Sequence, residues 1–122
     1  MSPTARSLAY CRKMGWTAGV VEQTIPKTFI KRDFLGFADM IVLRPDLDLP
    51  ADSNVTGIVA VQVTSGSEGE SGGHHADRVK KIQAEPRAAV WKSCGGLIEV
   101  WSWSKQGARG KRKVWTLREE SL

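Results

Sequence analysis

The sequence predicts an α/β domain in which a mixed central sheet is flanked by helices. Two short and nearly continuous apolar segments, 38–43 (ADMIVL) and 57–65 (GIVAVQVTS), indicate central strands that are covered by helices on both faces. Residues 97–104 (LIEVWSWS) alternate between apolar and polar side chains, and 113–118 (KVWTLR) follow a basic glycine loop as their partner strand. The length of 122 residues fits one domain, 1–122.

The first half of the chain contains the clearest start and stop signals. Ser2 as N-cap and Pro3 in the first turn begin a helix that Gly15 ends. Residues 16–25 (WTAGVVEQTI) are rich in β-branched side chains and predict a single strand, and 27–37 predict an irregular excursion. The residues that recur at helical spacing in the first helix, and are expected to face inward, are Ala5, Leu8 and Ala9, together with the stem of Arg12.

The second half predicts two helices between strands. Residues 44–56 have turn composition, and 66–73 (GSEGESGG) form a flexible loop. A helix over 76–83 places Val79 and Ile82 inward. A further helix begins at Pro86 and ends at Gly95-Gly96, so the expected order is α-β-β-β-α-α-β-β.

Composition narrows the function classes. A net charge of +5 and a pI of about 9.5 fit a polyanionic partner such as DNA, and equally fit a solvated basic surface. No apolar segment has the length of a membrane span or of a secretory leader. Cys11 and Cys94 fit reduced thiols, which favours a cytoplasmic protein, and with His74 and His75 they do not form a zinc pattern.

The candidate site follows from pairing the two apolar strands as a hairpin. If Arg44 pairs with Gly57, Asp39 lies opposite Gln62 on one face of the sheet, and Thr64 shares that face. Glu22 is the only acid of the first strand. Carboxylate and amide oxygens suit Mg²⁺. Alternatively, Asp39 caps a strand end, Glu22 faces solvent and Gln62 forms hydrogen bonds inside the sheet.

These segments resemble the core motif of the PD-(D/E)XK nuclease superfamily. The resemblance covers about residues 22–81 and rests on GFADMIVL, a polar turn, AVQVTS and a helix bearing ADRVKKI. It is strongest to phage-type nucleases and to the Holliday-junction-resolvase and VRR-NUC branches, where Gln can replace the acid. It implies a restriction-endonuclease-like core and a Mg²⁺- or Mn²⁺-dependent endonuclease. The implied substrate is branched or structured DNA, in the cytoplasm of a bacterial host and encoded by the host or a phage.

The resemblance assigns roles to individual residues. Asp39 is the principal metal ligand, Gln62 the second, Val63 contributes its backbone carbonyl, and Glu22 is the upstream acid. Asp33 is either an accessory ligand or an ion-pair partner of Lys31 or Arg32. The implied catalytic residues are Glu22, Asp39, Gln62 and Lys81.

The sequence departs from the family at Thr64, which stands where the family has Lys. Lys81 is the expected substitute because Arg78 and Lys81 are three residues apart on one helical face, with Arg78 binding phosphate. Two solvated basic residues are the alternative reading. The other cations expected to contact nucleic acid are Lys31, Arg32, Lys105, Arg109, Lys111 and Arg112.

Three further features leave alternatives open. Trp101 and Trp103 share a strand face with Glu99, where they either stack on exposed bases or pack in a core or dimer interface. His74 and His75, in a glycine-rich loop, either act in acid–base chemistry or are incidental, which is the commoner case for adjacent loop histidines. The rival functions are a non-catalytic DNA-binding module on the same fold and a phage-encoded, protein-binding regulator that uses the tryptophan strand. Homodimerisation is also open, because junction-cutting relatives pair to address two strands.

Overall fold

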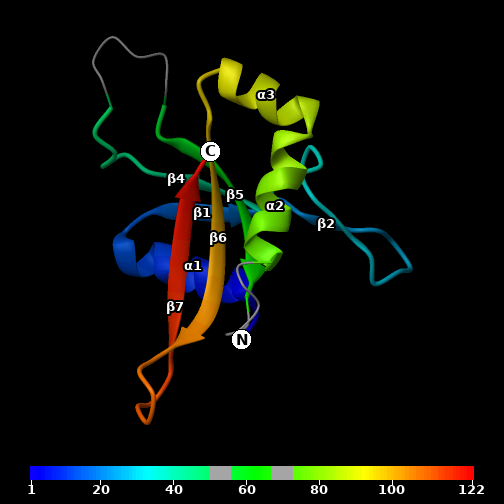
Figure 1. Ribbon diagram of the computed structural model, residues 1–122. Helices are drawn as coiled ribbons and strands as arrows, with labels where there is room; N and C mark the ends of the chain where they lie inside the picture. Colours follow the sequence, from blue (N-terminus) through cyan, green and yellow to red (C-terminus); the bar gives the residue numbers. More distant parts are fainter. Residues whose placement is uncertain (50–55, 67–72) are drawn as a thin grey trace.

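The computed structural model describes residues 1–49, 56–66 and 73–122, which fold as mixed α/β structure (Figure 1). A five-stranded sheet has the strand order β1-β4-β5-β6-β7, and β5 and β6 are its only parallel neighbours among the described strands. The elements in chain order are α1 (Pro3–Met14), β1 (Thr17–Val20), β2 (Gln23–Thr24), β3 (Lys31–Arg32), β4 (Met40–Leu43), β5 (Ile58–Ser65), α2 (Gly73–Gln83), α3 (Pro86–Ser93), β6 (Leu97–Gln106) and β7 (Val114–Ser121).

Helices cover both faces of the sheet, as the apolar strands predict. Cys11 of α1 packs with Met40 and Val61 on one face. Ile82 of α2 and Ala88 of α3 pack on the other face, against side chains of β5 and β6. Alternate residues of β5 therefore contribute to two separate apolar clusters, because side chains of a strand alternate between the faces. The second face is the one that also carries the candidate site.

The register between β4 and β5 is the one predicted from the sequence. Met40 pairs with Val61, and the Arg44 amide donates to the Gly57 carbonyl at 2.8 Å. The Asp39 amide continues the pairing by donating to the Val61 carbonyl at 2.9 Å. This register brings Asp39 and Gln62 together on the face covered by α2 and α3.

The predicted single strand over 16–25 is wrong, because it divides at residues 21–22. The amides of Val21 and Glu22 both donate to the Asp39 carbonyl, at 2.9 and 3.2 Å. Two residues opposite one is the arrangement of a β-bulge, which bends the strand. Beyond it, β2 leaves the sheet and pairs with β3, which lies inside the segment expected to be irregular. This two-stranded hairpin is an addition to the predicted element order.

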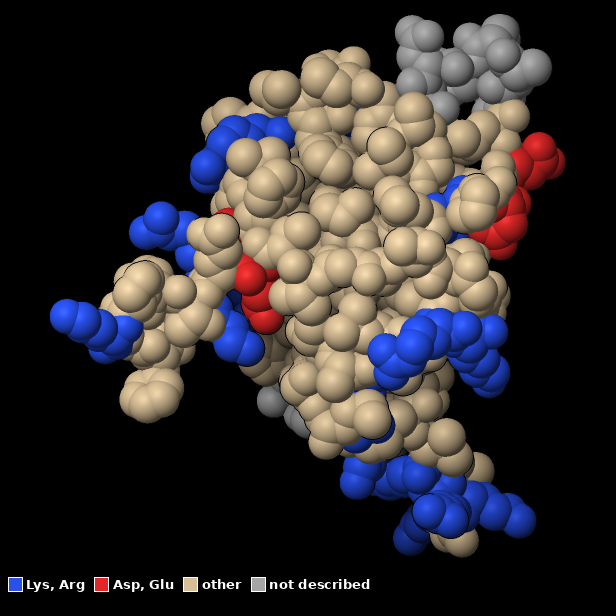
Figure 2. All heavy atoms as spheres, turned by 180° about the vertical axis from the view of Figure 1, so that it is seen from behind, with Lys and Arg blue, Asp and Glu red and all other residues tan. Residues whose placement is uncertain are grey.

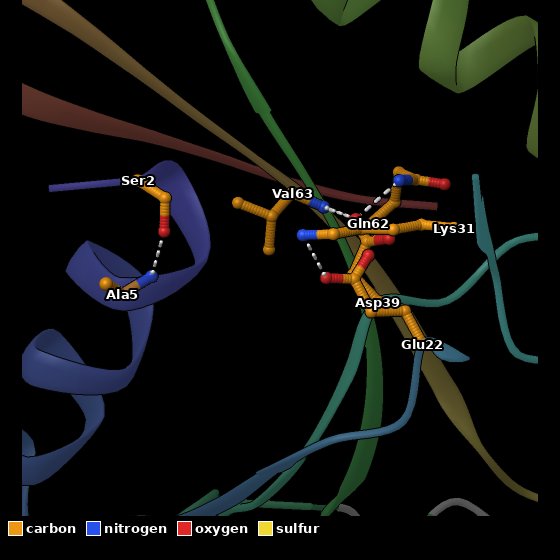
Figure 3. Close-up of polar contacts among 7 residues, drawn as sticks. All are labelled: Ser2, Ala5, Glu22, Lys31, Asp39, Gln62 and Val63. Carbon is orange, nitrogen blue, oxygen red and sulfur yellow. Dashed lines mark hydrogen bonds and ion pairs between the residues drawn. The ribbon is translucent and has the colours of Figure 1, made fainter. Parts of the chain in front are cut away.

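Helix α1 has the predicted ends. The Ser2 hydroxyl accepts from the Ala5 amide at 3.1 Å (Figure 3), Pro3 lies in the first turn, and Gly15 ends the helix at a left-handed φ of 80°. The two cap signals were therefore sufficient to place both ends of the helix.

The inward face of α1 differs from the expectation. Ser7 and Cys11 are buried, whereas Ala5, Leu8 and Ala9 are only half-buried. Apolar periodicity missed Ser7 because its hydroxyl is satisfied inside: it donates to the Pro3 carbonyl and accepts from Trp103 Nε1, each at 2.9 Å.

Trp101 and Trp103 are buried, which excludes stacking on exposed bases and a direct dimer or partner contact through these rings. They lie with Glu99 on the α1 face, as the alternation predicts. Glu99 accepts from Trp101 Nε1 at 2.9 Å and is 3.5 Å from Arg44 Nη1, so its buried carboxylate is compensated. β6 lies between β5 and β7 and forms backbone pairing with both strands.

The helices on the other face begin and end close to the predicted residues. α2 starts at Gly73, three residues before the predicted start, and its Ile82 is buried while Val79 is partly buried. α3 begins at Pro86 as expected. Residues 50–55 of the predicted turn and 67–72 of the predicted loop lie outside the described residues. Across the described ranges, no helix combines the length and apolar character needed to cross a membrane.

Candidate metal centre and basic cleft

Three acids from separate segments converge at one edge of β4. Glu22 follows the bulge, Asp33 follows β3, and Asp39 immediately precedes β4. One carboxylate oxygen of each lies within 4.8 Å of the others. The bulge and the β2–β3 hairpin bring the first two acids to the third. Of the two roles open for Asp33 from the sequence, the structure favours membership of the acidic cluster.

Asp39 is the buried member of this cluster, with 5% of its surface exposed. Its Oδ2 accepts from Gln62 Nε2 at 2.6 Å and from the Val63 amide at 2.7 Å (Figure 3). Burial raises the pKa of Asp39 to about 7; the Val63 hydrogen bond opposes this rise, and Asp33 and Glu22 add to it. At neutral pH the carboxyl of Asp39 is therefore partly protonated, and a cation placed among these acids would displace that proton.

Gln62 contributes an amide oxygen that lacks a hydrogen-bond partner among the described residues. The side chain is 3% exposed, and its Oε1 is buried. Figure 3 shows the amide nitrogen turned toward Asp39 and the oxygen on the far side. A buried polar atom without a partner is costly in free energy. Rotation of the amide brings this oxygen toward the acids, so the donor set of three carboxylates and one amide oxygen fits Mg²⁺ or Mn²⁺.

The backbone of Val63 faces the same site. Its N–H points at Asp39, and in an extended strand the N–H and C=O of one residue point to the same side. The Val63 carbonyl therefore lies on the edge of β5 that faces the acidic cluster. This orientation agrees with the backbone ligand that the resemblance implies.

Two lysines form ion pairs with two of the three acids. Lys31 Nζ is 3.5 Å from Glu22, and the Lys81 ammonium contacts Asp33. Lys81 thus reaches the cluster from the last turn of α2. Thr64 is buried, and its hydroxyl contacts the Ser65 carbonyl at 3.4 Å. It brings no positive charge to the site.

A cleft of about 710 Å³ opens beside the acids and is lined mainly by cations. Figure 2 shows acidic atoms framed by Lys and Arg on the side where the β2–β3 hairpin projects. The cationic residues that line the cleft are Lys31, Arg32, Arg78, Lys81 and Arg87. Four of these were expected from the sequence, and the cleft therefore unites residues predicted from two separate segments.

Arg87 is the cleft residue that the sequence did not reveal. It lies in the first turn of α3, where Glu85 Oε1 is 2.6 Å from its Nε. Its guanidinium extends over Gly36, whose φ is 78° and where an added Cβ would lie 2.5 Å from Arg87 Nη2. No sequence pattern joins α3 to residue 36, because the contact arises only when α3 packs beside the loop before β4.

A second basic surface lies at the β6–β7 hairpin. The predicted cations are exposed there, and Figure 2 shows Lys and Arg gathered over this projection. Beside them, the guanidinium of Arg6 lies 3.9 Å from the ring centre of Trp115, and Lys105 Nζ lies 5.4 Å from it. Trp115 is 38% exposed, so it, rather than Trp101 or Trp103, is the tryptophan available to a ligand on this surface.

The expectation that His75 is an incidental loop residue is wrong. His75 is buried in the first turn of α2, its Nδ1 contacts the Ser102 hydroxyl, and its Nε2 is 2.9 Å from Glu120. Ser102 is 6% exposed beneath α2, which keeps its hydroxyl from a substrate. The three residues anchor α2 to β6 and β7. Sequence periodicity did not reveal this contact because the helix starts before the position predicted for it.

Comparison with known proteins gave no match for this chain, whether against protein-family models, curated proteins or solved structures.

Proposed function

We propose that this chain is a metal-dependent DNA endonuclease with a restriction-endonuclease-like core, related to the PD-(D/E)XK superfamily. The observation that carries the proposal is the convergence of Glu22, Asp33 and Asp39 beside a cleft lined by cations. Acids that bind a divalent cation and cations that bind phosphate are the two components that phosphodiester hydrolysis requires. The side-chain amide of Gln62 lies beside Asp39 and would add its oxygen as a neutral ligand once the amide rotates.

The arrangement of elements supports the relationship. The segments α1, β1, β4, β5, α2 and β6 follow the superfamily's order α-β-β-β-α-β when the β2–β3 hairpin and α3 are treated as insertions. Asp39 precedes the second strand of this core and Gln62 lies near the end of the third. These are the positions at which the superfamily carries its metal-binding residues.

Asp39, Glu22, Gln62 and the Val63 carbonyl would hold Mg²⁺ or Mn²⁺, with Asp33 as a further carboxylate. When bound, such an ion lowers the pKa of a coordinated water and neutralises charge on a phosphodiester. The chain's own contribution is a carboxylate cluster with one buried member, Asp39, and its affinity for a cation would rise as Asp39 loses its proton.

Lys81 supplies the positive charge that Thr64 lacks. Its ammonium group contacts Asp33, and it comes from a helix that packs on the sheet. Arg78 and Arg87 extend the positive charge along the cleft and would bind the phosphates that flank the cleaved bond.

Cleavage of DNA tests the proposal. Supercoiled plasmid and a four-way junction are incubated with the protein and Mg²⁺ or Mn²⁺, and the Asp39→Asn variant is compared with Asp48→Asn, an exposed aspartate outside the cluster. We expect the parent and Asp48→Asn to cut and Asp39→Asn to be inactive. Equal cutting by all three proteins, or no cutting by the parent with either metal, would contradict the proposal.

A non-catalytic DNA-binding module is the second candidate. Two observations favour it: Thr64 replaces the motif lysine, and the Gln62 amide presents its nitrogen to Asp39. In this case the lysines and acids would form a static ion-pair network at the base of a phosphate-binding cleft. DNA binding that weakens steeply with salt, without cleavage in either metal, would identify this function.

A further inference from the structure

The turn of the β2–β3 hairpin presents an apolar tip to solvent. Phe29 is fully exposed, at 104% of its reference surface, and Ile30 is 61% exposed. The hairpin projects away from the sheet in Figure 1 and forms a separate lobe of the surface in Figure 2. Large apolar side chains that lie together in solvent are not stabilised by burial. A partner that covers them would bury this apolar surface, which stabilises the complex.

The tip is ordered by its own hydrogen bonds. The Ile25 amide donates to the Ile30 carbonyl at 2.8 Å, and the Thr28 hydroxyl donates to the Ile25 carbonyl at 2.8 Å. The same hydroxyl accepts from the Ile30 amide at 3.2 Å. Lys27 adopts a left-handed φ of 63°, a conformation that non-glycine residues rarely take. Phe29 is thus held outward by a built turn, which reduces the entropy lost when it binds.

The hairpin is joined directly to the acidic cluster. Glu22 precedes β2 and Asp33 follows β3, so both ends of the hairpin carry acids of the candidate metal centre. Lys31 and Arg32 of β3 line the basic cleft. The hairpin therefore connects the apolar tip directly to the place where the cleaved phosphate is proposed to bind.

The charges around the tip identify its partner. Exposed Lys27 lies at the turn, and Lys31 and Arg32, which follow the turn on β3, line the cleft. An apolar wedge flanked by phosphate-binding cations suits DNA, because the side chain can enter the base stack while the cations hold the backbone on either side. A segment of this kind separates base steps most easily where the stack is already weak.

We propose that Phe29, supported by Ile30, is a wedge that inserts between bases of DNA next to the bound phosphate. This inference rests on the proposed function and names its substrate class: DNA whose stacking opens at little cost, such as a branch point, a mismatch or a flexible pyrimidine–purine step. The cluster would then act on a backbone that the hairpin has bent.

Fluorescence of 2-aminopurine measures the insertion. The base is placed at the branch point of a four-way junction and, separately, inside a regular duplex, and protein is added with Ca²⁺ in place of Mg²⁺. We expect the parent to increase the fluorescence of the junction, because unstacking relieves quenching, and Phe29→Ala to abolish the increase. Phe29→Ala should weaken junction binding about tenfold, which is the order expected when one base no longer stacks on an aromatic ring, and duplex binding much less.

Matched variants separate a wedge from a general loss of structure. Phe29→Trp should preserve the fluorescence increase, and Val90→Ala, at another exposed apolar residue on α3, should behave like the parent. An unchanged signal in Phe29→Ala would overturn the wedge. So would binding to phosphatidylglycerol vesicles, or self-association in sedimentation, that depends on Phe29 while the DNA signal does not.

The wedge and the nuclease proposal fail separately. If the parent protein unstacks the bases but never cuts DNA in Mg²⁺ or Mn²⁺, the wedge proposal stands and the nuclease proposal is contradicted. If Phe29→Ala cuts DNA at the parental rate and neither protein changes the fluorescence, the wedge proposal is contradicted and the nuclease proposal stands.

Discussion

The side-chain amide of Gln62 donates to Oδ2 of Asp39 across 2.6 Å, joining β5 to the residue that precedes β4. Both side chains are buried, and the oxygen of the same amide has no partner among the described residues. A buried polar atom without a partner is uncommon in folded proteins. In the proposed metal site, rotation of the amide would offer this oxygen to the bound cation.

The pH dependence of stability should reveal the burial of Asp39. An ordinary aspartate has a pKa of 3.8, whereas Asp39 in the folded protein has a pKa of about 7. Between these values the folded state binds more protons than the unfolded state, so the free energy of unfolding should fall as the pH rises through this interval. Asp39→Asn removes this titration, and at pH above about 7 it should be more stable than the parent by on the order of a few kcal/mol.

Chemical denaturation across this pH interval, without added metal, measures both quantities. Asp48→Asn is the control, because Asp48 is exposed and lies outside the cluster. If Asp39→Asn and the parent show the same slope against pH, the carboxyl of Asp39 is not the group that carries the buried charge.

Removal of Lys81 should separate its role from that of a surface cation. We expect Lys81→Ala to cut about a hundredfold more slowly, because it removes the positive charge nearest the acids. Lys80→Ala, at the neighbouring exposed position of α2, should retain parental activity. Single-turnover cleavage at saturating protein makes the comparison independent of binding. Equal rates for both variants would assign the charge to another residue.

Gln62→Glu tests the proposed role of Gln62 as a metal ligand. A fourth carboxylate beside Glu22, Asp33 and Asp39 adds repulsion when no cation is present, so the metal-free protein should become less stable. The same change should tighten Mn²⁺ binding, because a charged oxygen replaces a neutral one. Thermal unfolding with and without Mn²⁺ measures both effects. A variant that is destabilised equally in the two conditions would place Gln62 outside the metal site.

We expect the β6–β7 hairpin to bind DNA phosphates and to contribute little to recognition of the base sequence. Replacing its cations by Ala should reduce the slope of log affinity against log salt by about one for each phosphate that is no longer neutralised. Lys92→Ala, at an exposed cation of α3 that lines neither basic surface, is the control. A quadruple variant with the parental slope would show that the hairpin does not touch DNA. The residues replaced together are Lys105, Arg109, Lys111 and Arg112.

The sheet register was predictable because it depends on local rules. Two apolar strands joined by one polar turn can pair symmetrically, and this alone placed Asp39 opposite Gln62. The alternation of 97–104 likewise placed Trp101 on the face opposite Ile98. Both inferences use the two-residue period of a strand, which tertiary packing does not alter.

The approach of Glu22 and Asp33 was not predictable from the residues alone. It depends on a bulge in which two amides share the Asp39 carbonyl, and on a short hairpin in a segment without strand periodicity. Arg87 was missed for a similar reason, because it reaches Gly36 only after α3 has packed. Ser7 and His75 were missed because buried polar groups that find partners do not follow apolar patterns.

Titration of the metal-free protein with Mn²⁺, followed by calorimetry, tests the central claim most directly. We predict one site in the parent protein, with an affinity that rises as the pH is raised through about 7, because the ion displaces the proton of Asp39. We predict that the site is lost in Asp39→Asn and kept in Asp48→Asn. An Asp39→Asn protein that binds Mn²⁺ as the parent does, or a parent that binds none, would show that Glu22, Asp33 and Asp39 do not form a metal centre.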